Sequence, residues 1–167
     1  MWRENLKSER QKAIGMRQQA TVGATGRSPL YSHALRFLRA ARVAHLATAD
    51  QNGRPHVIPI CYVFDGNEIY SPIDEKPKQS SPLLLKRIRN IQANSNVAVV
   101  VDRYDEDWRR LAYVLMTGKA MVLLRGAKYQ RALRLLRKKY PQYRRMRLEE
   151  RPMIRIAPVR WKSWGRL

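Results

Sequence analysis

Two tight turns between short apolar segments constrain the fold of this chain more than any other feature. Asn52-Gly53 lies between the apolar segments 43–49 and 54–64, and Asp65-Gly66 separates the second of these from a third at 68–71. Such pairs predict β-hairpins, because both residues readily adopt the positive φ that a two-residue turn needs. Parallel neighbours would need a long crossover connection. We therefore expect these strands to pair antiparallel.

Three longer apolar segments predict the remaining strands. They occupy 96–104, 111–124 and 153–164 and are rich in β-branched and aromatic residues. Gly118 interrupts the second of them, where we expect a bulge or the close approach of another backbone.

Three residues allow the orientation of these strands to be predicted. His45 falls inside a nearly continuous apolar run, so we expect it to be a core residue whose polar atoms are satisfied. Trp161 and Trp164 are three positions apart and should face opposite sides of the last strand.

Apolar residues at helical spacing predict three helices beside the strands. They lie at 29–41, from Pro82 through Ile91, and at 127–140, and a Ser-Pro pair begins each of the first two. Pro141 should end the third. Short turns between most strands favour a mainly β protein with peripheral helices, in which six antiparallel strands curl into a barrel.

The chain divides into an extension and one domain. Residues 1–28 lack a repeating apolar face, and glycines break any helix before Ser28, so we expect a basic, flexible extension. Residues 29–167 have the length of one domain. The net charge is +21, and residues 125–167 alone hold fifteen Lys and Arg against two acids. Such a surface attracts anions, including nucleotides and polyglutamate.

Several classes of protein and site are disfavoured. The lone Cys61 rules out an intramolecular disulfide, and no apolar run reaches the roughly 18 residues of a membrane span. Without an apolar signal core, the chain should be cytoplasmic and should not bind membranes. One Cys and three scattered His give no metal-ligand spacing. No nucleophile or acid–base pair stands out, so we expect no catalytic side chain.

A basic segment around Pro77 suits a phosphate ester. Asp74-Glu75-Lys76-Pro77-Lys78 follows the third strand, and Lys86 and Arg89 follow on the next helix. A phosphate monoester carries about −1.5 to −2 charges at neutral pH and is held best by charged donors. A solvated turn is the alternative for the two lysines that flank Pro77.

The order of these motifs resembles the pyridoxamine-phosphate-oxidase-like split-barrel superfamily. The motifs are Asn52-Gly53-Arg54-Pro55-His56, Pro59-Ile60, Asp65-Gly66, Ile69-Tyr70-Ser71, Asp74-Glu75-Lys76-Pro77-Lys78, Arg89-Asn90-Ile91 and Gly118-Lys119-Ala120. The lysine-proline segment and residues 101–108 are similar to the branch of F(420)-dependent enzymes. The resemblance extends over roughly residues 30–165, and none of its motifs is specific by itself.

The resemblance implies a six-stranded split β-barrel that forms a homodimer, with two cofactor sites at the subunit interface. One strand would lie along the ring of FMN or the deazaflavin F(420), Ser71 and Ile73 would line its ribityl chain, and basic residues would hold its phosphate. Two tryptophans would close the pocket. The residues expected to bind the cofactor are His56, Val57, Ile58, Pro59, Ile60, Ser71, Ile73, Asp74, Lys76, Lys78, Lys86, Arg89, Asn90, Trp161 and Trp164.

The implied activity is that of an F(420)-dependent oxidoreductase, which passes a hydride to an electron-poor organic substrate. The cofactor would supply this chemistry, and the basic last quarter would suit its oligoglutamate tail. Alternatives on the same fold are an FMN-dependent oxidoreductase and a flavin- or haem-binding protein without turnover. A non-specific nucleic-acid-binding protein is a further alternative, but no recognisable nucleic-acid-binding motif supports it, so we expect no such partner.

Overall fold

The computed structural model describes residues 29–74 and 82–167. The extension at 1–28 and the two lysines flanking Pro77 lie outside the described residues. The helices are α2 (Pro29–Ala40), α3 (Lys86–Ala93) and α4 (Ala127–Lys139), and the short 3-10 helices are η1 (Pro82–Leu84), η2 (Trp108–Arg110) and η3 (Pro141–Arg144). The strands are β1 (Val43–Ala49), β2 (Pro55–Cys61), β3 (Val63–Phe64), β4 (Ile69–Pro72), β5 (Asn96–Arg103), β6 (Ala112–Leu123) and β7 (Met153–Gly165).

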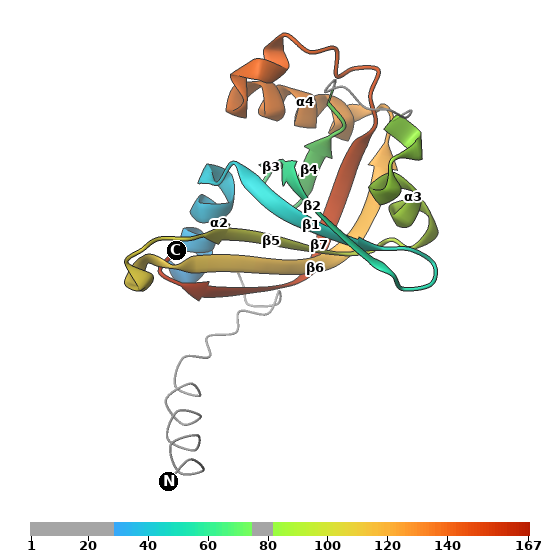
Figure 1. Cartoon of the computed structure of the whole chain (residues 1–167). Helices are drawn as coiled ribbons and strands as arrows, with labels where there is room; N and C mark the ends of the chain where they lie inside the picture. The colour runs from blue at the N-terminus through green and yellow to red at the C-terminus, as the bar shows by residue number, and fades with distance from the viewer. Residues whose placement is uncertain (1–28, 75–81) are drawn as a thin grey trace.

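All seven strands in the described ranges form one antiparallel sheet with the order β2-β1-β5-β6-β7-β4-β3. The sheet curls so strongly that its two edge strands, β2 and β3, are consecutive pieces of one segment (Figure 1). The expected mainly β, antiparallel architecture with peripheral helices is therefore confirmed. The sheet is an open half-barrel of seven strands, where the sequence predicted six.

The extra strand arises because the segment predicted as one strand at 54–64 bends at Tyr62. The Tyr62 backbone N–H donates to the Tyr140 hydroxyl at 3.0 Å, and that hydroxyl donates to the Tyr62 carbonyl at 2.8 Å. The Tyr62 hydroxyl in turn donates to the Leu38 carbonyl at 2.6 Å. A side chain from another part of the chain thus replaces the strand partner at this point.

Gly118 lies at a register shift between β6 and β7, as the sequence predicted. A Cβ atom at this position would lie 2.2 Å from the Ala157 carbonyl oxygen and 2.9 Å from the Pro158 Cα. Because the contacts are with backbone, no side-chain rotation would relieve them. Gly118 therefore permits the long β6–β7 pair to bend.

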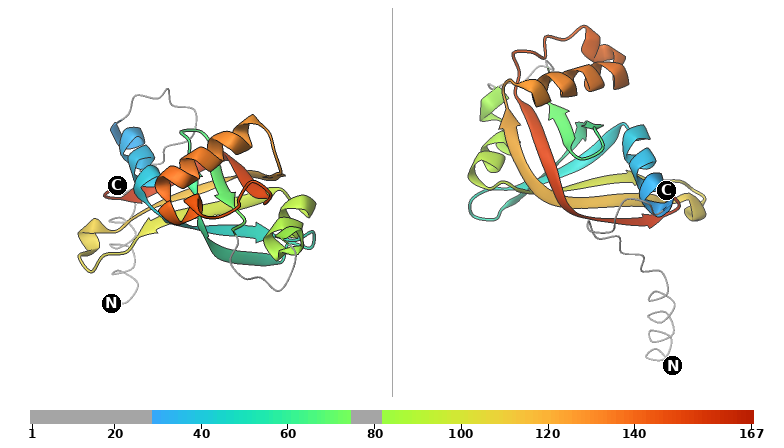
Figure 2. Two further views of the ribbon diagram at one scale, coloured as in Figure 1. Left: turned by 90° about the horizontal axis from the view of Figure 1, so that it is seen from above. Right: turned by 180° about the vertical axis from the view of Figure 1, so that it is seen from behind.

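Two clusters of buried side chains form the core of the described chain. The larger lies on the concave face of the sheet, where Leu46, Val99, Met116 and Trp161 meet residues of α2 and α3. The smaller lies beneath α4, which crosses one end of the sheet (Figure 2). No helix among the described residues is long and apolar enough to span a membrane.

The orientation of β1 differs from the prediction for His45. Ala44, Leu46 and Thr48 are buried, so the alternation of the strand directs His45 to the convex face. Its side chain is 48% exposed, with Nδ1 3.4 Å from the Asp102 carboxylate. The prediction of a core histidine was wrong, because alanines on both faces made the segment read as uniformly apolar.

The two tryptophans of β7 do face opposite sides of the strand. Trp161 is 8% exposed and belongs to the concave core, whereas Trp164 is 42% exposed and stacks on Tyr113 with ring centroids 5.9 Å apart. That part of the prediction is confirmed.

Candidate functional site

Strand β2 is an edge strand that pairs only with β1 in the described part of the chain. Pro55 and Pro59 have no N–H, and proline in an edge strand occupies positions whose N–H would point away from the partner strand. Val57 lies between them with the same parity, so its N–H is directed to the free edge. Its side chain is 59% exposed. The free edge therefore offers backbone hydrogen-bonding groups beside an apolar surface.

The alternate residues of β2, which are His56, Ile58 and Ile60, face inward. Ile58 packs against the concave core and Ile60 is buried within it. His56 is half-buried, and its Nδ1 is buried without a hydrogen-bond partner among the residues that the structure describes. Buried polar atoms nearly always have a partner, so an unpaired ring nitrogen at a strand edge indicates a position where a ligand can bind.

Two cations from α3 lie close to His56. Burial lowers the pKa of His56, and the charges of Lys86 and Arg87 lower it further. The imidazole is therefore held neutral, while the surrounding potential is positive. Such a potential favours an anion at this end of the strand.

A buried hydrogen bond fixes α3 against β1. Asn90, which is 3% exposed, donates from Nδ2 to the Thr48 Oγ1 at 3.0 Å, and that hydroxyl lies 3.4 Å from the His56 carbonyl, to which it donates. Ile88 and Ile91 of the same helix are buried in the concave core. Asn90 thus acts in this structure as a positioning residue for the start of α3.

Arg87 is a candidate site residue that the sequence analysis missed. It is half-buried; burial lowers its pKa, and the charge of Asp74 raises it. Lys86 and Arg89, which the sequence singled out, are both exposed. The spacing to Ile91 could have identified Arg87, because Arg87 lies four residues before this apolar residue, which is buried on the inward face of α3.

The remaining expected residues lie in different surroundings. Ser71 is 2% exposed and Ile73 is fully buried in the concave core, so neither side chain lines an open surface. Trp161 is also part of that core, and Trp164 lies on the convex face near the end of β7. Lys76 and Lys78 lie outside the described residues, so the structure says nothing of their positions.

An open depression of about 540 Å³ lies over the convex face beside the β6–β7 bulge. Ala98 and Thr117 form part of its floor, and Pro55 of β2 lies at its border. Lys119 and Arg160 contribute positive charge, and Lys119 donates to the Asn96 side chain at 2.7 Å. Its size is within the range of small-molecule sites.

Lys139 is a further polar group, and it lies where β2 meets the end of α4. The Lys139 ammonium lies 4.2 Å from the centre of the Tyr62 ring and is buried without a hydrogen-bond acceptor in the described ranges. Burial lowers the pKa of Lys139 to about 8, with a smaller contribution from Arg42. The cation–π contact only partly compensates for the lost hydration of the ammonium.

No cluster of three or more His, Cys, Asp or Glu side chains in residues 29–74 and 82–167 is arranged to hold a metal ion. The polar groups near β2 are instead one imidazole, two cations and one carboxylate. This set is suited to an anionic organic ligand.

Comparison with solved structures supports the fold. The chain resembles a conserved hypothetical protein from Mycobacterium tuberculosis (TM-score 0.68, 19% identity, 90% of this chain and 89% of that chain covered). It also resembles HutZ, the haem storage protein from Vibrio cholerae (0.63, 15%, 83% and 98%). A FAD-binding protein from Mesorhizobium loti is similar as well (0.58, 25%, 88% and 97%). No curated protein sequence matches the chain significantly.

The sequence itself matches a family over nearly its whole domain. The model described as pyridoxamine 5'-phosphate oxidase aligns with residues 31–165. These residues include every described strand, all of α3 and most of α2, the two helices that pack on the concave face. Together with the curled antiparallel sheet, this match shows that the chain belongs to the pyridoxamine 5'-phosphate oxidase family.

Proposed function

We propose that this chain is an oxidoreductase that binds a phosphate-bearing flavin-type cofactor beside β2 and reduces an electron-poor organic molecule. The observation that carries the proposal is the unpaired imidazole of His56, which lies beside Lys86 and Arg87 at an open strand edge. This set of groups fits a ligand with an anionic end and a flat apolar ring.

The charge balance of the site supports a phosphate at this end. Asp74 is the acidic group that acts on Arg87, and Lys86 has no acidic partner within the described ranges. Two cations against one carboxylate leave an excess positive charge, which a phosphate of about −1.5 to −2 would neutralise. On sequence grounds alone, we include Lys76 and Lys78 as further phosphate ligands.

The edge of β2 would hold the ring. The Val57 N–H and the neighbouring carbonyls can hydrogen-bond to polar ring atoms, and the exposed Val57 and Pro59 side chains offer an apolar surface to the ring. A bound flavin or deazaflavin supplies hydride transfer. The protein residues bind the phosphate, orient the ring and exclude water from it.

F(420) is our first choice of cofactor and FMN the second. F(420) carries an oligoglutamate tail, and the exposed Lys119 and Arg160 beside the depression on the convex face provide positive charge for such a tail. A flavin- or haem-binding role without turnover is the second candidate function. It is favoured by the structural similarity to HutZ, a haem storage protein, and to a FAD-binding protein.

We also propose that the convex face forms a homodimer interface. Its central rows join Val57, Ala47, Ala98 and Thr117 across four strands, and Val57 and Val159 are 59% and 58% exposed. Small and apolar residues dominate this part of the face, as in the core of a protein–protein interface. Contact between two such faces would bring the β2 edge of each chain close to its partner.

The direct test is a fluorescence titration of the purified chain with FMN and with F(420). Loss of a charge-assisted hydrogen bond lowers affinity roughly ten- to hundredfold, so we expect Arg87→Gln and the pair Lys76→Ala plus Lys78→Ala each to weaken binding by about that factor. Arg134→Gln on α4 removes the same charge far from β2 in sequence and should have little effect. Unchanged binding by Arg87→Gln would refute the placement of the phosphate.

The titration also separates the candidate functions. Preference for F(420) with reduction of a quinone acceptor would support the proposed activity, and preference for FMN would support the second cofactor. If the chain binds flavin or haem but reduces no acceptor, the binding role without turnover is correct.

A further inference from the structure

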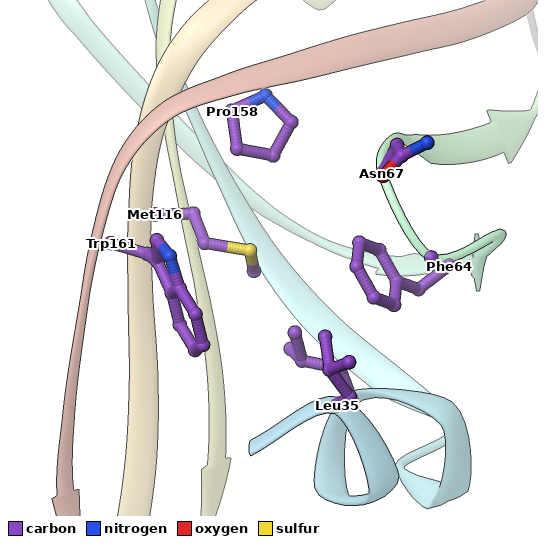
Figure 3. Close-up of a pocket in the computed structure, with 8 residues that line it drawn as sticks. Leu35, Phe64, Asn67, Met116, Pro158 and Trp161 are labelled. Atoms are coloured by element: carbon purple, nitrogen blue, oxygen red, sulfur yellow. The ribbon is translucent and has the colours of Figure 1, made fainter. Parts of the chain in front are cut away.

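A cavity of about 110 Å³ lies between α2 and the concave face of the sheet (Figure 3). It is open to solvent on one side beside the β3–β4 turn. Its lining comes from α2 (Leu35 and Leu38), from β3 with the following turn (Phe64, Gly66 and Asn67), from β6 (Met116) and from β7 (Pro158 and Trp161). None of these residues belongs to the cluster of His56, Lys86 and Arg87.

The walls of this cavity are mainly apolar and include two aromatic side chains. Leu38 and Met116 are only 1% and 2% exposed. Phe64 and Trp161 offer ring surfaces on opposite sides of the cavity (Figure 3). An engineered protein cavity of about 150 Å³ with similar walls takes up benzene. A fused three-ring flavin would not fit this volume, so the cavity is distinct from the proposed cofactor site.

The rim of the cavity supplies polar donors. The Asn67 side-chain amide has no hydrogen-bond partner among the residues described, although its backbone N–H donates to Asp65 at 2.9 Å. Arg39 reaches the same place, because its Nη2 lies 3.6 Å from where a Cβ of Gly66 would be. A guanidinium thus lies close to Gly66 at the mouth of an apolar cavity, and Asn67 belongs to the same rim.

The positive charge of Arg39 is not neutralised by the nearby acids. Asp65 accepts hydrogen bonds from the backbone of its own turn and lies 3.9 Å from Arg131. Glu68 accepts from Arg155, Lys128 and Tyr70. Arg39 itself has no acidic partner in the described chain. The charge is therefore available to a ligand.

We propose that this cavity binds a small aromatic carboxylic acid, with the ring among Phe64, Met116 and Trp161 and the carboxylate at Arg39 and Asn67. The apolar walls select the ring, and the rim selects the acid over the uncharged hydrocarbon. The site is independent of the cofactor proposal, since it shares no residue with β2.

Benzoate is the probe for this site, in isothermal titration of the full chain. A ligand of about nine heavy atoms in a small site should bind with a Kd of about 0.1–10 mM. We expect Leu35→Phe, which fills the cavity, to weaken binding at least roughly tenfold, and Arg39→Gln to weaken it about tenfold. Arg36→Gln is the matched control, because Arg36 is an exposed arginine of the same helix outside the cavity lining.

The outcomes decide the proposal. Benzoate binding that fails with Leu35→Phe and Arg39→Gln but survives Arg36→Gln supports it. No binding by the parent at 10-fold above the expected Kd, or equal binding of toluene and benzoate, overturns it. A second readout is the NMR transfer of magnetisation between the benzoate ring protons and the Trp161 indole. It is measured on the parent chain and therefore needs no substitution that could unfold the protein. Absence of that transfer in a saturated sample would also refute the site.

Discussion

Glu68 joins β4, β7 and α4 in one ionic network, and its neutralisation should lower the stability of the fold. Its carboxylate accepts from the Tyr70 hydroxyl at 2.6 Å, from the Lys128 ammonium at 3.0 Å and from the Arg155 guanidinium. The side chain is only 13% exposed. The hydrogen bond from Arg155 is the largest cause that lowers the pKa of Glu68 from 4.5 to about 2. We predict that Glu68→Gln destabilises the protein.

The magnitude follows from the pKa. A tenfold change in a proton-binding constant corresponds to about 1.4 kcal/mol, so the lowered pKa represents about 3 kcal/mol in favour of the charged form. Lys128 is 56% exposed, and solvent screening reduces its share. We therefore expect Glu68→Gln to lower the free energy of unfolding by about 2 kcal/mol at pH 7.

The pH dependence gives the sign of this effect. The folded pKa lies below the unfolded one, so the carboxylate contributes its full stability above about 4.5 and loses it as the pH falls toward 2. Urea unfolding of parent and variant, followed by circular dichroism at pH 7, 5, 4 and 3, measures the difference. That difference should shrink by about half between pH 7 and pH 3.

The control for this experiment is Glu150→Gln, an exposed acid outside the network. It should change stability by less than about 0.5 kcal/mol. A Glu68→Gln difference as small as that of the control, or one that is the same at pH 7 and pH 3, would show that the network does not stabilise the fold.

Three further predictions concern the sheet, its edge and its convex face. Gly118→Ala should lower the free energy of unfolding by at least about 3 kcal/mol, because its Cβ would overlap the Ala157 backbone. The control Gly53→Ala, which has open space around a φ of 77°, should lower it by only about 1 kcal/mol. Equal losses of the two variants in urea unfolding would contradict this reason. The pKa of Lys139 is lowered to about 8 in the folded protein, so the unfolded chain binds more protons than the folded one between about pH 8 and 10.5. The free energy of unfolding should therefore rise with pH in this range for the parent but not for Lys139→Met. Parallel curves of stability against pH for the two proteins would show that Lys139 is not the cause. Ala98→Glu places a charge at the centre of the convex face and should convert the proposed homodimer to a monomer in sedimentation analysis, so an unchanged sedimentation mass would exclude this face as the interface.

Local sequence patterns predicted much of the fold. Asn52-Gly53 and Asp65-Gly66 marked the turns, and Pro29 and Pro141 lie at the observed helix ends. The predicted start of the second helix at Pro82 was wrong, because Pro82 begins the 3-10 helix η1 and α3 begins at Lys86. Gly118 marked the bulge, and the spacing of the tryptophans on β7 gave their opposite faces. Each of these features depends on residues close together in the chain, where backbone conformation and side-chain alternation follow from residue type.

The site was predicted less completely. The edge strand from His56 to Ile60 was identified from the sequence, and Asn90 was named with it, but its bond to Thr48 was not anticipated. Arg87 was overlooked in favour of its exposed neighbours. The roles assigned to the lysines flanking Pro77 stay predictions, since those residues lie outside the described part of the chain.

The sequence by itself determined the antiparallel pairing, the approximate positions of the helices and the membership of the family. Only the tertiary structure decided where the sheet bends, which way His45 points and which side chains meet at Glu68 and His56. The bend at Tyr62 depends on a hydroxyl 78 residues away, and the Glu68–Arg155 contact joins residues 87 apart. Local patterns set turns and faces because those are properties of neighbouring residues, whereas such long-range contacts exist only after the sheet has curled.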